Sequence, residues 1–186
     1  MLAALDMQNA ATVLNQRFAA RGWPPLAIGI GVNSGTVRIG DMGSRVRRAY
    51  TAMGDAVNVA SRLEGRTKTY AVGILVGEAT RARVKDVVFR EIDRIRVKGK
   101  EEAITVYEPL AKKEQSGEQS AELELWDNAL RAYRAQQWET AQAHLARLQF
   151  MNPACGLYGA YLKKIEEKRR NPPPAGWNGI THFDEK

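Results

Sequence analysis

Apolar side chains change their spacing several times along this chain, and these changes constrain the fold more than any other feature. Residues 7–18 repeat at helical spacing. Residues 26–33 and 36–39 are short runs rich in branched side chains, so we expect two strands joined by a tight turn into a hairpin. Residues 87–97 and 103–107 predict a second hairpin. The sequence therefore predicts an α+β fold with a mostly antiparallel sheet.

Glycine and proline predict where several of these elements end. Pro24 and Pro25 follow the first helix, which we expect to end at about Ala20. A second helix is expected from Gly54 to Gly65, where glycine is a common residue just after a helix. A strand over residues 71–76 and a short helix over residues 78–85 follow, and Pro109 is expected to stop the last strand.

The composition changes again after residue 110. Residues 111–120 are polar and carry no apolar side chain larger than alanine, which is typical of a linker. Three helices are then expected, over residues 122–136, 138–150 and 157–169. The first two resemble a tetratricopeptide helix pair, one residue short in its turn, through Trp126, Tyr133, Trp138, Ala141, Leu145, Leu148 and Pro153. We thus expect a first domain at 1–110, a linker at 111–120, a helical region at 121–170 and an extended tail at 171–186, in which Trp177 and Phe183 are candidate anchors.

Charge and cysteine content narrow the class of protein. A net charge of +7 would attract an acidic partner, and it does not by itself choose among a nucleotide triphosphate, a nucleic acid and an anionic membrane. Cys155 is the only cysteine, so an internal disulfide is excluded and a reducing, cytoplasmic location is expected. The longest apolar runs are far shorter than the roughly 20 residues of a membrane-spanning helix.

The helix expected after Gly54 carries the clearest candidate binding residues. Its residues at positions 56, 59, 60 and 63 form an apolar face, and Asn58 and Arg62 project from the opposite face, one turn apart. An amide and a guanidinium near a helix N-terminus suit a polyanion, because the helix dipole and the free N–H groups also favour negative charge. The alternative is a solvated polar face with Asp55 as the N-cap.

Three segments resemble class III nucleotide cyclases: IGIGVNSGTVRIGDMGS at residues 28–44, YTAMGDAVNVASR at residues 50–62 and VKGK at residues 97–100. The resemblance covers about residues 1–110 and implies part of a ferredoxin-like catalytic domain. It also implies that Thr51 hydrogen-bonds the purine of ATP, that Asn58 orients the ribose and that Arg62 binds the triphosphate. Either Lys98 or Lys100 would contact a phosphate.

The same resemblance implies two Mg²⁺ or Mn²⁺ ions, held by two aspartates that lie upstream of the first helix in the family. The aspartates of this chain outside the 50–62 motif do not fall in those metal motifs. Asp55 lies within the 50–62 motif, at a helix start where the family has a polar residue that does not bind metal. His144 and His182 have no partner at metal-ligand spacing, so no metal ligand is assigned to this chain. The aspartates considered are Asp6, Asp41, Asp55, Asp86 and Asp93.

Two functional hypotheses follow. In the first, the chain is the C-terminal part of a bacterial adenylate cyclase that makes cyclic AMP, inactive alone and paired as a homodimer or with another cyclase domain. ATP is then the acidic partner, a nucleic acid is not, and a membrane is reached only through the N-terminal part of a longer parent. In the second, the chain is a non-catalytic module that pairs with an intact cyclase and binds a partner through its helical tail. Under either hypothesis, isolated residues 1–110 would expose an apolar sheet edge, so we expect poor solubility or dependence on a partner.

Overall fold

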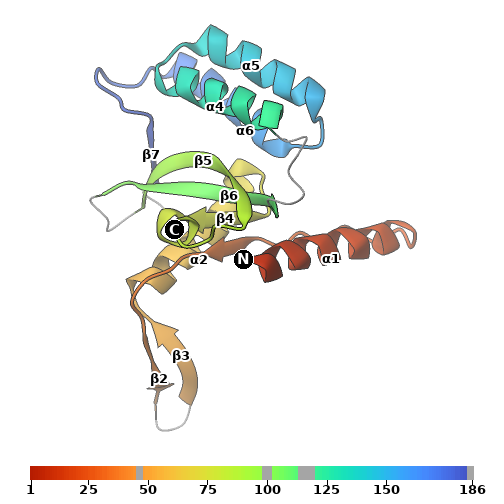
Figure 1. The fold of residues 1–186 in the computed structure, drawn as a ribbon, viewed down its shortest axis with the longest axis vertical. Helices are drawn as coiled ribbons and strands as arrows, with labels where there is room; N and C mark the ends of the chain where they lie inside the picture. The colour runs from red at the N-terminus through yellow and green to blue at the C-terminus, as the bar shows by residue number, and fades with distance from the viewer. Residues whose placement is uncertain (45–47, 98–101, 113–119, 184–186) are drawn as a thin grey trace.

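The computed structural model describes residues 1–44, 48–97, 102–112 and 120–183. Its elements mix helices and strands, so the α+β prediction is confirmed (Figure 1), and two strands that the sequence did not predict lie at residues 48–53 and 180–183. The helices are α1 (Leu2–Ala19), α2 (Asp55–Tyr70), α3 (Glu78–Arg81), α4 (Ser120–Arg134), α5 (Trp138–Met151) and α6 (Gly156–Arg170). The strands are β1 (Ile30–Val32), β2 (Arg38–Gly43), β3 (Arg48–Met53), β4 (Ile74–Gly77), β5 (Val87–Val97), β6 (Ile104–Lys112) and β7 (Ile180–Phe183).

Five strands form a mixed sheet in the order β1-β4-β6-β5-β7. The expected β5–β6 hairpin is confirmed, since these strands pair antiparallel. The expected hairpin of residues 26–33 with 36–39 is wrong: β1 pairs in parallel with β4, and β2 pairs with β3. Branched side chains predict a strand but not its partner. The crossover through α2 places β1 beside β4, where both strands contact that helix.

Glycine in β1 allows this close packing of strand and helix. A Cβ added at Gly31 would overlap the carbonyl oxygen of Ala60 in α2. The side chains of Ile30 and Val32 point to the other face, where they pack in a small core with Ala4 of α1. The glycines of residues 29–31 thus serve a backbone approach between a strand and a helix.

Two element ends that were predicted from a glycine or a proline are wrong. Helix α2 passes through Gly65 and ends at Tyr70, because the buried side chains of Thr67 and Tyr70 hold its last turn in the core. A glycine inside a helix costs only about 1 kcal/mol, which such packing offsets. Strand β6 continues through Pro109 to Lys112. The proline is tolerated because β4 pairs with β6 only as far as Tyr107, and a bulge in the β5–β6 ladder follows it.

Helices α4–α6 pack above the sheet and share one core with it (Figure 1). The contact is specific at the bulge of β5, where the register shifts between Glu91 and Asp93. The indole Nε1 of Trp126 donates to the Glu91 carbonyl, and the Tyr161 hydroxyl donates to the Ile92 carbonyl, each at 2.6 Å. Two carbonyls at an irregular point of the strand are therefore satisfied by side chains of α4 and α6. Most of the predicted linker, residues 113–119, lies outside the described residues.

A buried arginine of the β5–β6 hairpin lies beneath these helices, paired with the half-buried Glu108. Arg90 is 5% exposed and donates to Glu108 at 2.5 Å and to the Tyr158 hydroxyl at 2.9 Å. Burial raises the pKa of Glu108 above its ordinary value, although the charge of Arg90 opposes that shift. The alternation of residues 87–97 did predict a strand, but it did not predict that a guanidinium would lie in the interior.

The C-terminal tail adds a strand to the sheet. Strand β7 pairs in parallel with the end of β5, from Arg94 opposite Ile180 to Val97 opposite Phe183. Trp177 and Phe183, the two candidate anchors, both pack against the main core. The tail is thus tied to the five-stranded sheet as well as to the helices that precede it.

Candidate functional site

Strand β3 and helix α2 meet at a junction that only glycine can make without strain. Gly54 has φ 151° and ψ 167°, and a Cβ added there would come within 3.0 Å of the Thr36 carbonyl oxygen. Thr51 lies three residues before this junction, on β3 and opposite Gly40 of β2, and it is exposed. The junction fixes where the strand that carries Thr51 joins the first turn of α2.

Helix α2 presents Asn58 and Arg62 away from the core. Its buried residues are Val59, Leu63, Thr67 and Tyr70, whereas Asn58 is exposed and Arg62 is half-buried. The backbone N–H of Asn58 donates to the Gly54 carbonyl at 3.2 Å, so Asn58 lies in the first turn of the helix. Its position near the positive end of the helix dipole favours an anionic ligand. Lys98 and Lys100 lie outside the described residues.

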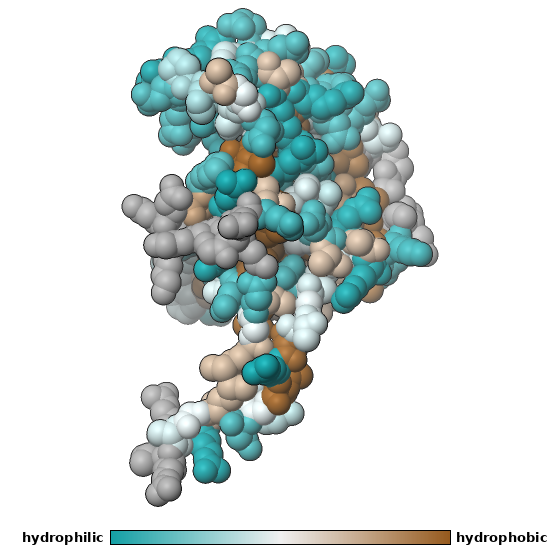
Figure 2. All heavy atoms as spheres, turned by 90° about the vertical axis from the view of Figure 1, so that its left-hand side faces the viewer, coloured by the Kyte–Doolittle hydropathy of each residue, from teal (hydrophilic) through white to brown (hydrophobic). Residues whose placement is uncertain are grey.

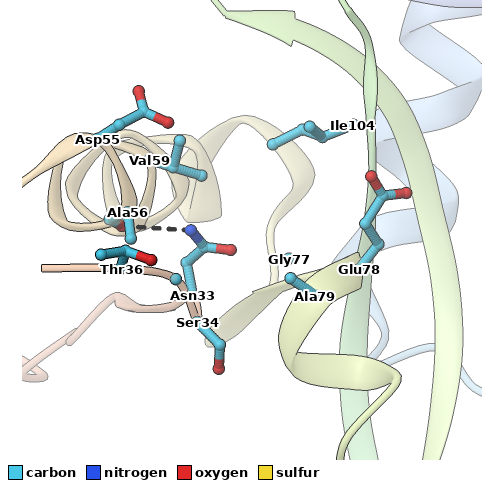
Figure 3. A pocket seen from close by; sticks show the side chains of 11 residues that line it. Asn33, Ser34, Thr36, Asp55, Ala56, Val59, Gly77, Glu78, Ala79 and Ile104 are labelled. Atoms are coloured by element: carbon cyan, nitrogen blue, oxygen red, sulfur yellow. Dashed lines mark hydrogen bonds between the residues drawn. The ribbon is translucent and has the colours of Figure 1, made fainter.

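The first turn of α2 also forms one wall of a pocket of about 340 Å³ (Figure 3). Asn33, at the end of β1, points between α2 and α3, and its amide donates to the Ala56 carbonyl at 3.2 Å. Ser34 shares a hydrogen bond of 2.9 Å with Thr80, and Glu78 accepts the Thr105 N–H at 3.3 Å. Thr51, Asn58 and Arg62 do not line this pocket.

From sequence, residues 33–35 predict only a tight turn, and neither Asn33 nor Glu78 stands out. A sequence signal for them does exist, because each directly follows a short strand, β1 or β4. Since these strands are parallel neighbours, polar residues at their ends meet at one edge of the sheet. That signal is readable only once the parallel pairing is known.

The described residues do not fit a metal centre. Among them there is no group of three or more His, Cys, Asp or Glu side chains that could hold a metal ion. Cys155 is a free thiol, half-buried and 3.4 Å from a guanidinium nitrogen of Arg90. No chemical step through a metal is therefore derived from the residues of this chain.

An arm of the molecule extends beside the site (Figure 1). Strands β2 and β3 form this β2–β3 arm, which projects from the body on the side away from α4–α6. Apolar residues lie on the surface where the arm meets the body (Figure 2). The large apolar side chains exposed on the arm and beside it are Val37, Ile39, Tyr50, Met53 and Val57.

This mixed sheet, with a helix that presents an amide and a guanidinium, defines a candidate nucleotide-binding domain. Residues 1–108 match the family described as the adenylate and guanylate cyclase catalytic domain. The match covers more than half of the 186 residues, so the chain belongs to this family, as the sequence motifs predicted.

Individual relatives agree with this assignment. The chain is 40% identical over 106 residues to adenylate cyclase 1 of Rhizobium meliloti, covering 56% of this chain and 16% of that protein. It is 41% identical over 114 residues to the adenylate cyclase of Anabaena cylindrica, covering 57% of this chain and 23% of that protein. The chain thus spans less than a quarter of the length of either relative.

A solved structure shows the same fold. The adenylyl cyclase CyaB from P. aeruginosa matches with a TM-score of 0.52 and 33% identity, covering 59% of this chain and 56% of that one. None of the helices in the described ranges combines the length and the apolar character that a membrane crossing requires.

Proposed function

We propose that this chain supplies the purine-binding and transition-state-binding side of an adenylate cyclase site, which converts ATP to cyclic AMP and pyrophosphate. One observation carries the proposal: Thr51, Asn58 and Arg62 lie on two elements joined at Gly54, outside the core that fixes α2. The family match includes all three positions.

Each residue has a role that its chemistry suits. The Thr51 hydroxyl can donate to and accept from the purine edge. The Asn58 amide orients the ribose, and the Arg62 guanidinium stabilises the negative charge that develops at the α-phosphorus. Lys98 or Lys100 adds a further phosphate contact. The first turn of α2 contributes its dipole without any rearrangement.

A second domain completes the site in this proposal. Two Mg²⁺ or Mn²⁺ ions require carboxylate oxygens, which the described part of this chain does not gather. Another cyclase domain that carries the two metal-binding aspartates would supply these oxygens. The β2–β3 arm supports such pairing, because Ile39 is 61% exposed, Met53 is 54% exposed and Tyr50 is 76% exposed.

The test is complementation in solution. The partner is the catalytic domain of the R. meliloti relative, with alanine at its own residues aligned to Asn58 and Arg62. We expect cyclic AMP from the mixture with magnesium or manganese, and none from either protein alone. Asn58→Ala or Arg62→Ala in this chain should lower the rate at least about 100-fold, the usual cost of one lost transition-state donor.

The matched control is Arg17→Ala, which removes an exposed arginine from α1. Equal rates for Arg17→Ala and Arg62→Ala would refute the role assigned to Arg62. Cyclic AMP made by this chain alone would refute the half-site.

The second candidate function is the non-catalytic module. It is favoured by Phe150 and Met151 at the end of α5, which are 87% and 47% exposed and are suited to contact a partner. Stable association with the cyclase partner but no restored activity would select this function.

A further inference from the structure

A fully buried carboxylate lies where the sheet, helix α2 and the C-terminal region meet. Asp93 of β5 is 0% exposed. Its Oδ2 accepts hydrogen bonds from the Tyr70 hydroxyl, the Lys164 ammonium and the Thr181 hydroxyl, each at 2.7 Å. Its Oδ1 accepts the N–H of Arg94 at 2.8 Å. The three side-chain donors come from α2, α6 and β7, and the backbone donor comes from β5 itself. We call Asp93 and these four residues the Asp93 cluster.

The negative charge of Asp93 is balanced by a positive charge within the Asp93 cluster. The ammonium of Lys164, whose side chain is 17% exposed, balances the buried carboxylate. It also lies 4.7 Å from the ring centre of Tyr70 and 4.8 Å from that of Tyr161, which are favourable cation–π positions. Burial first, and then the charge of Asp93, raise the pKa of Tyr70, which therefore remains a proton donor.

A second contact links α2 to the same strand of the tail. The Arg66 guanidinium lies 4.1 Å from the ring centre of Phe183 in β7, and the Tyr70 ring meets that of Phe183 edge to face at 6.4 Å. Phe183 of β7 thus contacts the last turn of α2 directly. Helix α6 holds the same turn indirectly, because Lys164 of α6 and Tyr70 of α2 both bind Asp93. The catalytic candidates lie on the same helix, and Arg62 precedes Tyr70 by about 12 Å of helix rise.

We infer that Tyr70 is a positioning residue. Its hydroxyl binds Asp93, which is also bound by Lys164 of α6 and Thr181 of β7. Through this shared carboxylate, α6 and β7 fix the position of α2 and therefore of Asn58 and Arg62. A helix is stiff along its axis, so a hydrogen bond at its last residue restrains its first turns. The consequence for turnover rests on the proposed function above. The positioning itself does not, because it is a property of the folded chain.

The experiment compares Tyr70→Phe with Tyr133→Phe in the full chain. Both tyrosines are almost fully buried, but the Tyr133 hydroxyl has no hydrogen-bond partner within the described ranges, so its loss breaks no such bond. Backbone amide NMR of the chain alone reads the position of α2. We expect the amide signals of Asn58 and Arg62 to move in Tyr70→Phe and to stay in Tyr133→Phe. Unmoved signals in Tyr70→Phe overturn the inference.

The complementation assay gives a second readout. A shift of α2 should lower kcat about tenfold, because displaced catalytic groups act in the transition state. The KM for ATP should stay within about twofold. An equal loss of kcat in Tyr133→Phe, or a change confined to KM, would show that the hydroxyl does not position the site.

The two proposals can fail separately. If the wild-type mixture makes no cyclic AMP, the proposed function fails, while the NMR comparison still decides the inference. If Tyr70→Phe does not fold, Thr181→Val replaces it, since that change removes another donor to the same oxygen and alters no residue of α2. It should move the Asn58 and Arg62 signals in the same way, and unmoved signals in this variant also overturn the inference.

Discussion

Replacing Trp126 by alanine should separate the C-terminal helices from the sheet. Trp126 is 0% exposed, and its ring packs against Tyr158 and Tyr161 at centroid distances of 5.8 and 5.1 Å. Truncating such a side chain costs about 3–5 kcal/mol of unfolding free energy. The lost indole N–H also leaves the Glu91 carbonyl unsatisfied, which adds about 1–3 kcal/mol. We therefore expect a loss of about 4–8 kcal/mol, a large part of the 5–15 kcal/mol that is typical of a domain.

Urea unfolding followed by far-UV circular dichroism measures this loss. Trp23→Ala is the matched control, because Trp23 is 51% exposed and contacts mainly Phe18 and Arg21. The control should cost about 1 kcal/mol or less. If Trp126→Ala lowers the free energy of unfolding no more than Trp23→Ala does, one continuous core does not join the helices to the sheet.

Two further predictions concern packing and pH. Gly31→Ala should destabilise the chain by about 3 kcal/mol in the same urea assay, because its Cβ would overlap the Ala60 carbonyl. Gly40→Ala is the control and should change the stability little, because a Cβ there meets nothing within 4 Å. Equal losses of stability in the two variants would contradict the close approach of β1 and α2. Five tyrosines have pKa values raised mainly by burial, so the stability they contribute is fully present below their unfolded value of about pH 10 and is lost as the pH rises above it. Urea unfolding at pH 9 and pH 11 should therefore show a marked loss at the higher pH, with most phenolate absorbance appearing only on unfolding; early ionisation of several tyrosines would contradict this. The five are Tyr70, Tyr107, Tyr133, Tyr158 and Tyr161.

The choice of candidate site residues rests on local sequence and stays a prediction. The positions of Thr51, Asn58 and Arg62 follow from one motif that spans a strand end, a glycine and the first turns of a helix. Their surroundings were not readable. Asn33 and Glu78 join the neighbouring pocket only because β1 pairs with β4, a contact between residues more than 40 positions apart.

Sequence alone determined the order of the helices, most of the strands, the apolar face of α2 and the family. These are local properties, since spacing shows which side of an element is apolar and a motif is a short run of residues. Only the tertiary structure decided which elements cover those faces. The pairing of β1, the passage of α2 through Gly65 and the burial of Asp93 all depend on distant partners, because a charge is buried only where the fold brings its counter-ion and donors. From sequence, Asp93 was only excluded as a metal ligand, and the fold gives it Lys164, Tyr70 and Thr181 as partners.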